Sequence, residues 1–118
     1  MRKALFPGSF DPFTAGHLNI LNRALTMFDE VVVAVGINQD KRGVFTNEQK
    51  LDIIRQTTKG LDNIEIISYD GLTVNICREL GIRHIVRGVR NMIDFDTERS
   101  IADANRRLAP EIETIIIP

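Results

Sequence analysis

Short apolar segments alternate along this chain with longer segments in which apolar side chains recur every three or four positions. The short segments are rich in Val and Ile, and the unbroken run at 31–35 is typical of a strand covered on both faces. The longer segments have the spacing of amphipathic helices, as in 17–27, where Leu18, Leu21 and Leu25 share one face. This pattern predicts strands at 3–6, 31–35, 64–67, 82–86 and 114–117, and helices at 17–27, 46–58, 72–80 and 94–108.

Strands and helices that alternate in this way predict an α/β fold, because each helix returns the chain to start the next parallel strand. The expected architecture is a Rossmann-like, doubly wound, five-stranded parallel sheet with helices on both faces. Thr46 and Gln49 have the spacing of a capping box at one helix start, and Gly81 follows another helix as its C-cap. Ligands of such sheets bind beyond the carboxyl ends of the strands, so we expect functional residues just after the first four strands.

The composition indicates a single folded domain and argues against nucleic-acid-binding and membrane proteins. A chain of 118 residues suits one domain, and 43% hydrophobic with 26% charged residues is typical of a folded protein. The formal net charge of −1 argues against a general nucleic-acid-binding protein. We expect a cytoplasmic protein with no membrane partner, because no apolar run approaches a membrane span and no secretory signal pattern opens the chain. The single cysteine, Cys77, excludes a disulfide framework, and we expect Cys77 and His84 to be structural.

The segment 7–17, after the first strand, carries the strongest chemical pattern, Pro-Gly-Ser-Phe-Asp-Pro-Phe-Thr-Ala-Gly-His. Gly8 allows a ligand to approach the backbone closely. Gly16 and His17 fall in the first turn of the next helix, where free N–H groups and the helix dipole attract anions. An ordinary glycine-rich turn with a surface histidine is the alternative interpretation.

Cations follow two other strands. Lys41 lies in the loop after the second strand, where a solvated lysine is the ordinary alternative. Arg87 and Arg90 flank a glycine at the end of the fourth strand, and paired guanidinium groups suit phosphates. The alternative for these arginines is a pair of structural ion pairs with Asp94 and Asp96.

Together these segments resemble the nucleotidyltransferase superfamily that carries an H/T-x-G-H motif. Gly-Ser-Phe-Asp-Pro at 8–12, followed by Thr14-x-Gly16-His17, carries the resemblance to the superfamily. The further matches make the whole chain similar to the bacterial phosphopantetheine adenylyltransferases, and they are Lys41, Phe45-Thr46, Arg87-Gly88-Val89-Arg90, Asp94-Phe95-x-x-Glu98 and Asn105.

The resemblance implies a role for individual residues. It implies that phosphopantetheine is bound by Ser9, Lys41, Thr73, Arg87 and Asn105. It implies that ATP is bound by Ser9, Phe10, His17, Gly88, Val89, Arg90 and Glu98. It implies that His17, Lys41 and Arg90 are catalytic. It implies no residue as a metal ligand, so we expect Mg²⁺ to be bound through the phosphates of ATP.

The implied reaction transfers the adenylyl group of ATP to 4′-phosphopantetheine and gives dephospho-coenzyme A (dephospho-CoA) and pyrophosphate, a step of coenzyme A biosynthesis. The resemblance also implies a homohexamer, with coenzyme A as a candidate feedback inhibitor and no nucleic-acid partner. Two other functions stay open. One is another nucleotidyltransferase of the superfamily, acting on nicotinamide mononucleotide or an alcohol phosphate, although those branches usually carry His at the position of Thr14. The other is an inactive nucleotide-binding fragment that binds ATP without turnover.

Family members continue beyond the strand that matches 114–117 with a Ser-rich I-S-S-[ST] segment that binds the ATP phosphates. We therefore expect residues 1–118 to be a single nucleotidyltransferase domain that is truncated at its C-terminus. In that case part of the triphosphate-binding surface is missing, and we expect weak ATP binding and low turnover.

Overall fold

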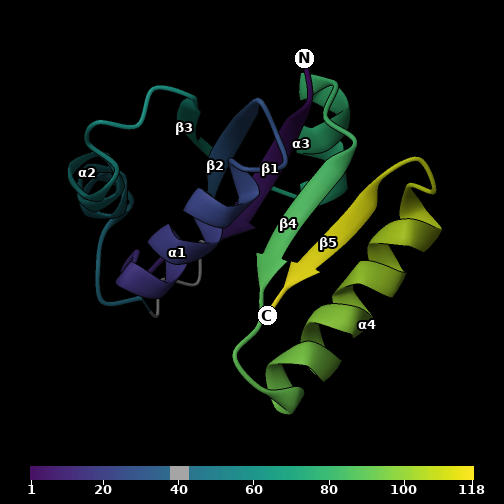
Figure 1. The fold of residues 1–118 in the computed structure, drawn as a ribbon. Helices are drawn as coiled ribbons and strands as arrows, with labels where there is room; N and C mark the ends of the chain where they lie inside the picture. Colours follow the sequence, from purple (N-terminus) through teal and green to yellow (C-terminus); the bar gives the residue numbers. More distant parts are fainter. Residues whose placement is uncertain (38–42) are drawn as a thin grey trace.

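A computed structural model describes residues 1–37 and 43–118 of the chain. Strands and helices alternate throughout this part, as the apolar pattern predicts (Figure 1). The strands are β1 (Lys3–Gly8), β2 (Glu30–Gly36), β3 (Ile64–Tyr69), β4 (His84–Gly88) and β5 (Glu113–Ile117). The helices are α1 (Ala15–Ala24), α2 (Asn47–Thr57), α3 (Thr73–Leu80) and α4 (Met92–Leu108).

The strands form one parallel sheet in the order β3-β2-β1-β4-β5. The chain builds outward from β1 to β3, then crosses back to place β4 on the other side of β1. The order therefore changes direction between β1 and β4, and the carboxyl ends of these two neighbouring strands lie at the same edge of the sheet. The α/β, Rossmann-like fold expected from the sequence is confirmed.

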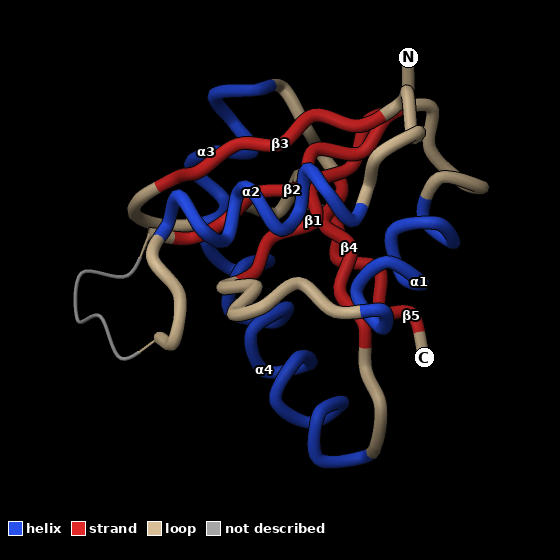
Figure 2. The backbone as a smooth tube through the Cα atoms, turned by 90° about the vertical axis from the view of Figure 1, so that its left-hand side faces the viewer, coloured by secondary structure: helices blue, strands red, loops and turns tan. Residues whose placement is uncertain are grey.

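Apolar side chains fill the space on both faces of the sheet. Leu21 of α1 and Ile54 of α2 pack with Val33 on one face, and Val74 and Cys77 of α3 pack with Ile85 on the other. Figure 2, turned by 90° from Figure 1, shows α1 and α2 in front of the strands and α3 and α4 behind them. Because β2 is covered on both faces, its residues 31–35 are all buried, which explains their unbroken apolar run.

The ends of two helices are capped as the sequence predicts. The Thr46 side chain accepts from the Gln49 N–H at 3.2 Å, and the Gln49 side chain accepts from the Thr46 N–H at 2.9 Å. Gly81 ends α3 in the left-handed conformation, with φ 70°. At the start of α3, Leu72 occupies the N-cap position and makes no side-chain hydrogen bond there.

α1 ends at Ala24 rather than at residue 27, and the boundaries of β4 differ from the prediction as well. β4 begins at His84 rather than at residue 82, because Ile82 still completes the turn that follows α3, where its N–H donates to the Cys77 carbonyl. The strand consequently includes Arg87 and Gly88 at its carboxyl end. A Cβ on Gly88 would lie only 2.7 Å from Cγ1 of Ile20, so this glycine allows α1 to pack closely against β4. No helix in residues 1–37 or 43–118 has the length and apolar character needed to cross a membrane.

Candidate active site

Two cavities open at the carboxyl edge of the sheet and share a wall. The first, which we call the α4 cavity, has a volume of about 300 Å³. The second, which we call the α1 cavity, has a volume of about 660 Å³ and lies over the start of α1. Both are lined by Gly8, Ser9, Arg87 and Glu98, so the end of β1 and the Arg87–Glu98 contact separate them.

Each cavity is lined by one set of the described residues with predicted roles, although Ser9, Arg87 and Glu98 belong to the shared wall and line both. Ser9, Thr73, Arg87 and Asn105 all line the α4 cavity. Ser9, Phe10, His17, Gly88, Val89, Arg90 and Glu98 all line the α1 cavity. Lys41 lies outside the described residues.

His17 sits in an aromatic surround at the start of α1. Its ring stacks on Phe13 at 5.4 Å between centroids and meets the edge of Phe10 at 5.1 Å. Phe10 itself is only 3% exposed, so its side chain packs on the histidine rather than offering a broad surface to a ligand. Its φ of 47° lies in the left-handed region, which shapes the turn between β1 and α1.

The hydrogen bonds of His17 fix the position of its ring proton. The Thr14 N–H donates to Nδ1 of His17 at 2.9 Å, and the Thr14 hydroxyl lies 3.0 Å from the same nitrogen. A backbone N–H can only donate, so Nδ1 must be an acceptor, and the neutral ring carries its proton on Nε2. This contact is also half of a capping box at Thr14, with histidine in the place usually taken by Glu or Gln.

The surroundings of His17 disfavour its charged form. The pKa of His17 is lowered from the ordinary value of 6.5, first by burial and then by the positive charges of Arg87 and Arg90. Protonation of Nδ1 would in addition place its N–H against the N–H of Thr14. His17 is therefore neutral at pH 7 and has one N–H to donate.

We expect NMR to detect this state directly. In ¹⁵N-labelled protein at pH 7, the His17 Nδ1 signal should be that of an unprotonated nitrogen, and the ring should titrate below pH 6.5. Since the unfolded chain binds this proton more tightly, the free energy of unfolding should fall as the pH drops through this range and be fully regained above pH 6.5. The sequence has two histidines, so a His84→Gln variant assigns the signals. A protonated Nδ1 at pH 7 would contradict the hydrogen-bond arrangement.

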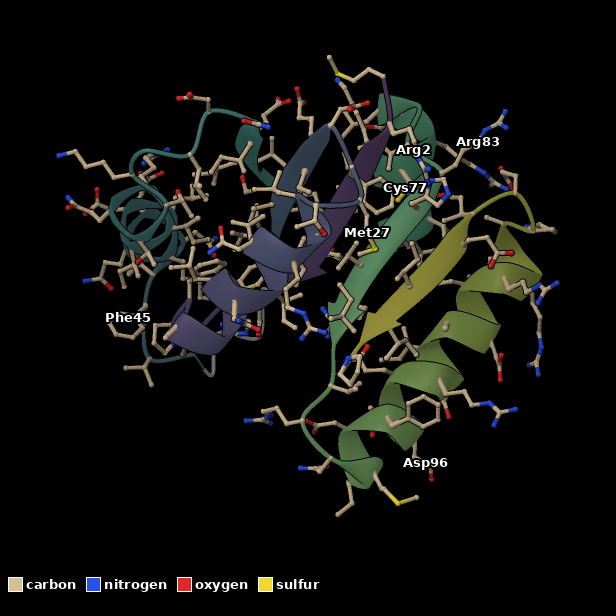
Figure 3. All side chains as sticks on the ribbon, in the orientation of Figure 1. Arg2, Met27, Phe45, Cys77, Arg83 and Asp96 are labelled. Carbon is tan, nitrogen blue, oxygen red and sulfur yellow. The ribbon has the colours of Figure 1, made fainter. Side chains whose placement is uncertain are left out.

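Arg87 makes the closest charged contact of the site. Its Nε donates to Oε1 of Glu98 at 2.9 Å and its Nη2 to Oε2 at 2.7 Å, while Nη1 donates to the Pro7 carbonyl. The alternative interpretation from the sequence pairs these arginines with Asp94 and Asp96. For Arg87 this pairing is wrong, because its partner is Glu98, and Figure 3 shows Asp96 pointing away from the sheet.

Arg90 does pair with Asp94, four residues further along the chain. Its Nε donates to the Asp94 carboxylate at 2.9 Å, and the arginine side chain is 87% exposed. The hydrogen bond from Arg90 lowers the pKa of Asp94. Because the guanidinium is so open to solvent, it can turn toward a bound anion at little cost.

Sequence reasoning missed three contacts at this edge. The Tyr69 hydroxyl lies 3.0 Å from the Thr73 hydroxyl in the α4 cavity, and the Pro7 carbonyl holds Arg87. Asp11 accepts from the N–H groups of Val44 and Phe45 at 2.8 and 3.0 Å, and so ties the turn after β1 to the chain before α2. The string at 8–12 contains Asp11, but nothing in its spacing indicated these distant partners.

Sequence comparison with known proteins identifies the family of this chain. A family model described as cytidylyltransferase-like matches residues 5–118. The phosphopantetheine adenylyltransferase of Flavobacterium psychrophilum is 47% identical over 117 residues, which cover 99% of this chain and 77% of the relative. That of Leuconostoc citreum is 52% identical, over 99% of this chain and 73% of the relative. This chain belongs to the phosphopantetheine adenylyltransferase family.

The family accounts for the motifs on which the resemblance was based, and that resemblance is confirmed. A similar fold is also found in proteins with much lower sequence identity. A crystal structure of the lipopolysaccharide core biosynthesis protein from Thermoplasma volcanium is 21% identical, covers 100% of this chain and 97% of its own, and superposes with a TM-score of 0.70. At this identity the likeness concerns the fold alone.

Cys77 and His84, which we expected to be structural, lie outside the two cavities. Cys77 is buried beneath the sheet, and burial raises the pKa of its thiol to about 11. Figure 3 shows it near the amino end of the strands. His84 packs against Phe28 at 5.3 Å between ring centroids, at the start of β4. Neither side chain lines either cavity.

Proposed function

We propose that this chain transfers the adenylyl group of ATP to 4′-phosphopantetheine, giving dephospho-CoA and pyrophosphate. The observation that carries the proposal is the pair of adjoining cavities at the change in strand order, with Ser9 and Arg87 in their common wall. An acceptor in the α4 cavity and ATP in the α1 cavity would meet with their phosphates beside each other. The names of the relatives support the same pair of substrates.

In this reaction the protein mainly positions the two substrates and stabilises negative charge on their phosphates. The acceptor phosphate is already a nucleophile, so no general base is required, and one of its oxygens attacks the α-phosphorus of ATP as pyrophosphate leaves. The Nε2–H of neutral His17 would donate to an α-phosphate oxygen, together with the N-terminus of α1. Arg87 would hold the acceptor phosphate, and Arg90 the phosphates of ATP.

We infer that the described residues of this site accept a divalent cation as part of the nucleotide. The carboxylates that line the α1 cavity are all engaged: Asp11 with backbone N–H groups, Asp94 with Arg90 and Glu98 with Arg87. Among the residues that the structure describes, no group of three or more His, Cys, Asp or Glu side chains could hold a metal ion. We infer that Mg²⁺ is carried by the ATP phosphates and supplies charge neutralisation there.

Other expectations from the sequence join the proposal as predictions. They are a single nucleotidyltransferase domain over residues 1–118, a cytoplasmic location, a homohexamer and feedback inhibition by coenzyme A. The role of Lys41 in binding the acceptor phosphate also stays a prediction.

A panel of acceptors tests the substrate. We expect pyrophosphate release from MgATP with 4′-phosphopantetheine, and none above background with nicotinamide mononucleotide or glycerol phosphate. Release with either of the latter instead would assign the chain to another branch of the superfamily. ATP binding with no release on any acceptor would indicate an inactive nucleotide-binding fragment.

Gly16 offers a test that separates ligand binding from folding. It lines the α1 cavity, and a Cβ there would lie 3.5 Å from the Thr14 hydroxyl, an ordinary contact, so the fold itself accepts alanine. We expect Gly16→Ala to leave Tm unchanged or raise it slightly, since alanine favours a helix by up to about 1 kcal/mol. The KM for ATP should rise, because the methyl group would project toward the phosphates. A fall in Tm with normal ATP binding would show that the glycine serves the fold.

A further inference from the structure

Arg87 and Glu98 line both cavities, and two hydrogen bonds join their side chains. Both carboxylate oxygens of Glu98 accept from Arg87, at 2.9 and 2.7 Å, in the side-by-side geometry of an arginine fork on a carboxylate. The side chains are 29% exposed for Arg87 and 11% exposed for Glu98. The Pro7 carbonyl holds the remaining terminal nitrogen of the guanidinium. Arg87 is therefore fixed in one orientation before any ligand binds.

Counting donors shows what Arg87 can still offer. A guanidinium has five N–H groups, and three are engaged with Glu98 and Pro7. One N–H on Nη1 and one on Nη2 are left for a ligand. A phosphate can accept from both without displacing the glutamate.

A phosphate that displaced Glu98 from Arg87 would bind less favourably than one that shares the arginine with it. A carboxylate that is 11% exposed would lose its cation while a second anion arrived beside it. Phosphate and carboxylate can instead share the arginine, each on its own edge of the guanidinium. This arrangement turns a flexible side chain into a preorganised anion site.

Glu98 also fixes the helix that forms one wall of the α4 cavity. No residue of α4 from Met92 to Leu108 is buried, so apolar packing holds this helix only loosely. The ion pair joins its N-terminal half to β4, and Asn105 follows Glu98 after two helical turns on the same face. The position of Asn105 in the α4 cavity thus depends on the same contact.

We propose that Glu98 is a positioning residue for the phosphopantetheine side of the site: it holds Arg87 so that two free N–H groups of that arginine bind the acceptor phosphate. This assignment differs from the ATP contact that the family resemblance implies for Glu98. It rests on the proposed function, since it names the ligand of Arg87 as the phosphate of the acceptor.

The test compares Glu98→Gln with Asp96→Asn, a matched control on the same helix whose side chain points away from the sheet. Glutamine keeps the size of the side chain but turns an amide N–H toward the donors of Arg87. We expect KM for 4′-phosphopantetheine to rise about tenfold or more, a loss of the size of one charged hydrogen bond, with KM for ATP and kcat changed less than about twofold. Asp96→Asn should change none of these.

A second variant separates the positioning role from a general loss of structure. In an Arg87→Lys background, Glu98→Gln should add little to the KM for the acceptor, because lysine has no fork to orient. A Glu98→Asp variant covers the case in which Glu98→Gln fails to fold. Its shortened carboxylate should raise KM for the acceptor above that of the unchanged chain, with KM for ATP changed less than about twofold.

Three outcomes would overturn the proposal: a rise in KM for ATP alone, a fall in KM for the acceptor, or full additivity with Arg87→Lys. The first would place Glu98 on ATP, and the second would mean that its carboxylate competes with the phosphate. Turnover by the unchanged chain is measured first, so a failure of the proposed reaction is distinguished from a failure of this inference.

Discussion

Replacement of His17 by alanine should lower kcat on the order of a hundredfold or more, by analogy with the loss of one hydrogen-bond donor to a developing oxyanion. The variant loses the Nε2–H that would face the α-phosphate, while the first turn of α1 keeps its backbone N–H groups. KM values should change much less than kcat, because the donor acts mainly on charge that develops in the transition state. Single-turnover measurement of dephospho-CoA formation gives the ratio directly.

His84 provides the matched control for this experiment. It packs against Phe28 near the amino end of β4, and its substitution by glutamine should leave kcat within about twofold of the unchanged chain. Normal turnover in the His17→Ala variant would remove the histidine from the mechanism and leave the helix N-terminus as the stabilising group.

Replacement of Arg87 by alanine should raise the KM for 4′-phosphopantetheine on the order of a hundredfold, the usual cost of truncating one partner of a hydrogen-bonded charge pair. ATP affinity should stay nearly intact, because Arg90, Gly88 and the start of α1 are retained on that side. The same change leaves Glu98 without its cation, so Tm should fall as well.

Arg87→Lys distinguishes charge from geometry in this position. Lysine keeps the positive charge beside Glu98 but cannot bind a carboxylate and a phosphate in two forked pairs. We expect its Tm to lie close to that of the unchanged chain, while its KM for the acceptor rises almost as far as in Arg87→Ala. A loss of ATP affinity with normal acceptor binding would reverse the assignment of Arg87 and Arg90.

The fold could be predicted because its determinants are local. The unbroken apolar run at 31–35 indicated a strand covered on both faces, and the capping residues Thr46 and Gly81 marked helix ends. Boundaries were less certain where tertiary contacts decide them. The apolar pattern predicts a start of β4 two residues too early, because hydrophobicity alone cannot show that Ile82 belongs to the turn after α3 rather than to the sheet.

The sequence predicts which candidate residues lie together at this edge, but not how they contact one another, and their roles stay predictions. The position of Ser9, His17, Arg87 and Arg90 just after the first and fourth strands predicts that they share one edge, where the two cavities lie. The pairing of Arg87 with Glu98 rather than Asp94 or Asp96 depends on how α4 is rotated against β4, which no local pattern encodes. The Nε2–H form of His17 likewise depends on the direction of one backbone N–H.

The step that decides the function is attack by the phosphate of 4′-phosphopantetheine on the α-phosphorus of ATP. It is tested most directly with phosphopantetheine whose terminal phosphate oxygens are ¹⁸O, incubated with MgATP and the protein and followed by mass spectrometry. We expect dephospho-CoA that retains every labelled oxygen, together with unlabelled pyrophosphate. Label in the pyrophosphate, or bound ATP with no dephospho-CoA at all, would contradict it.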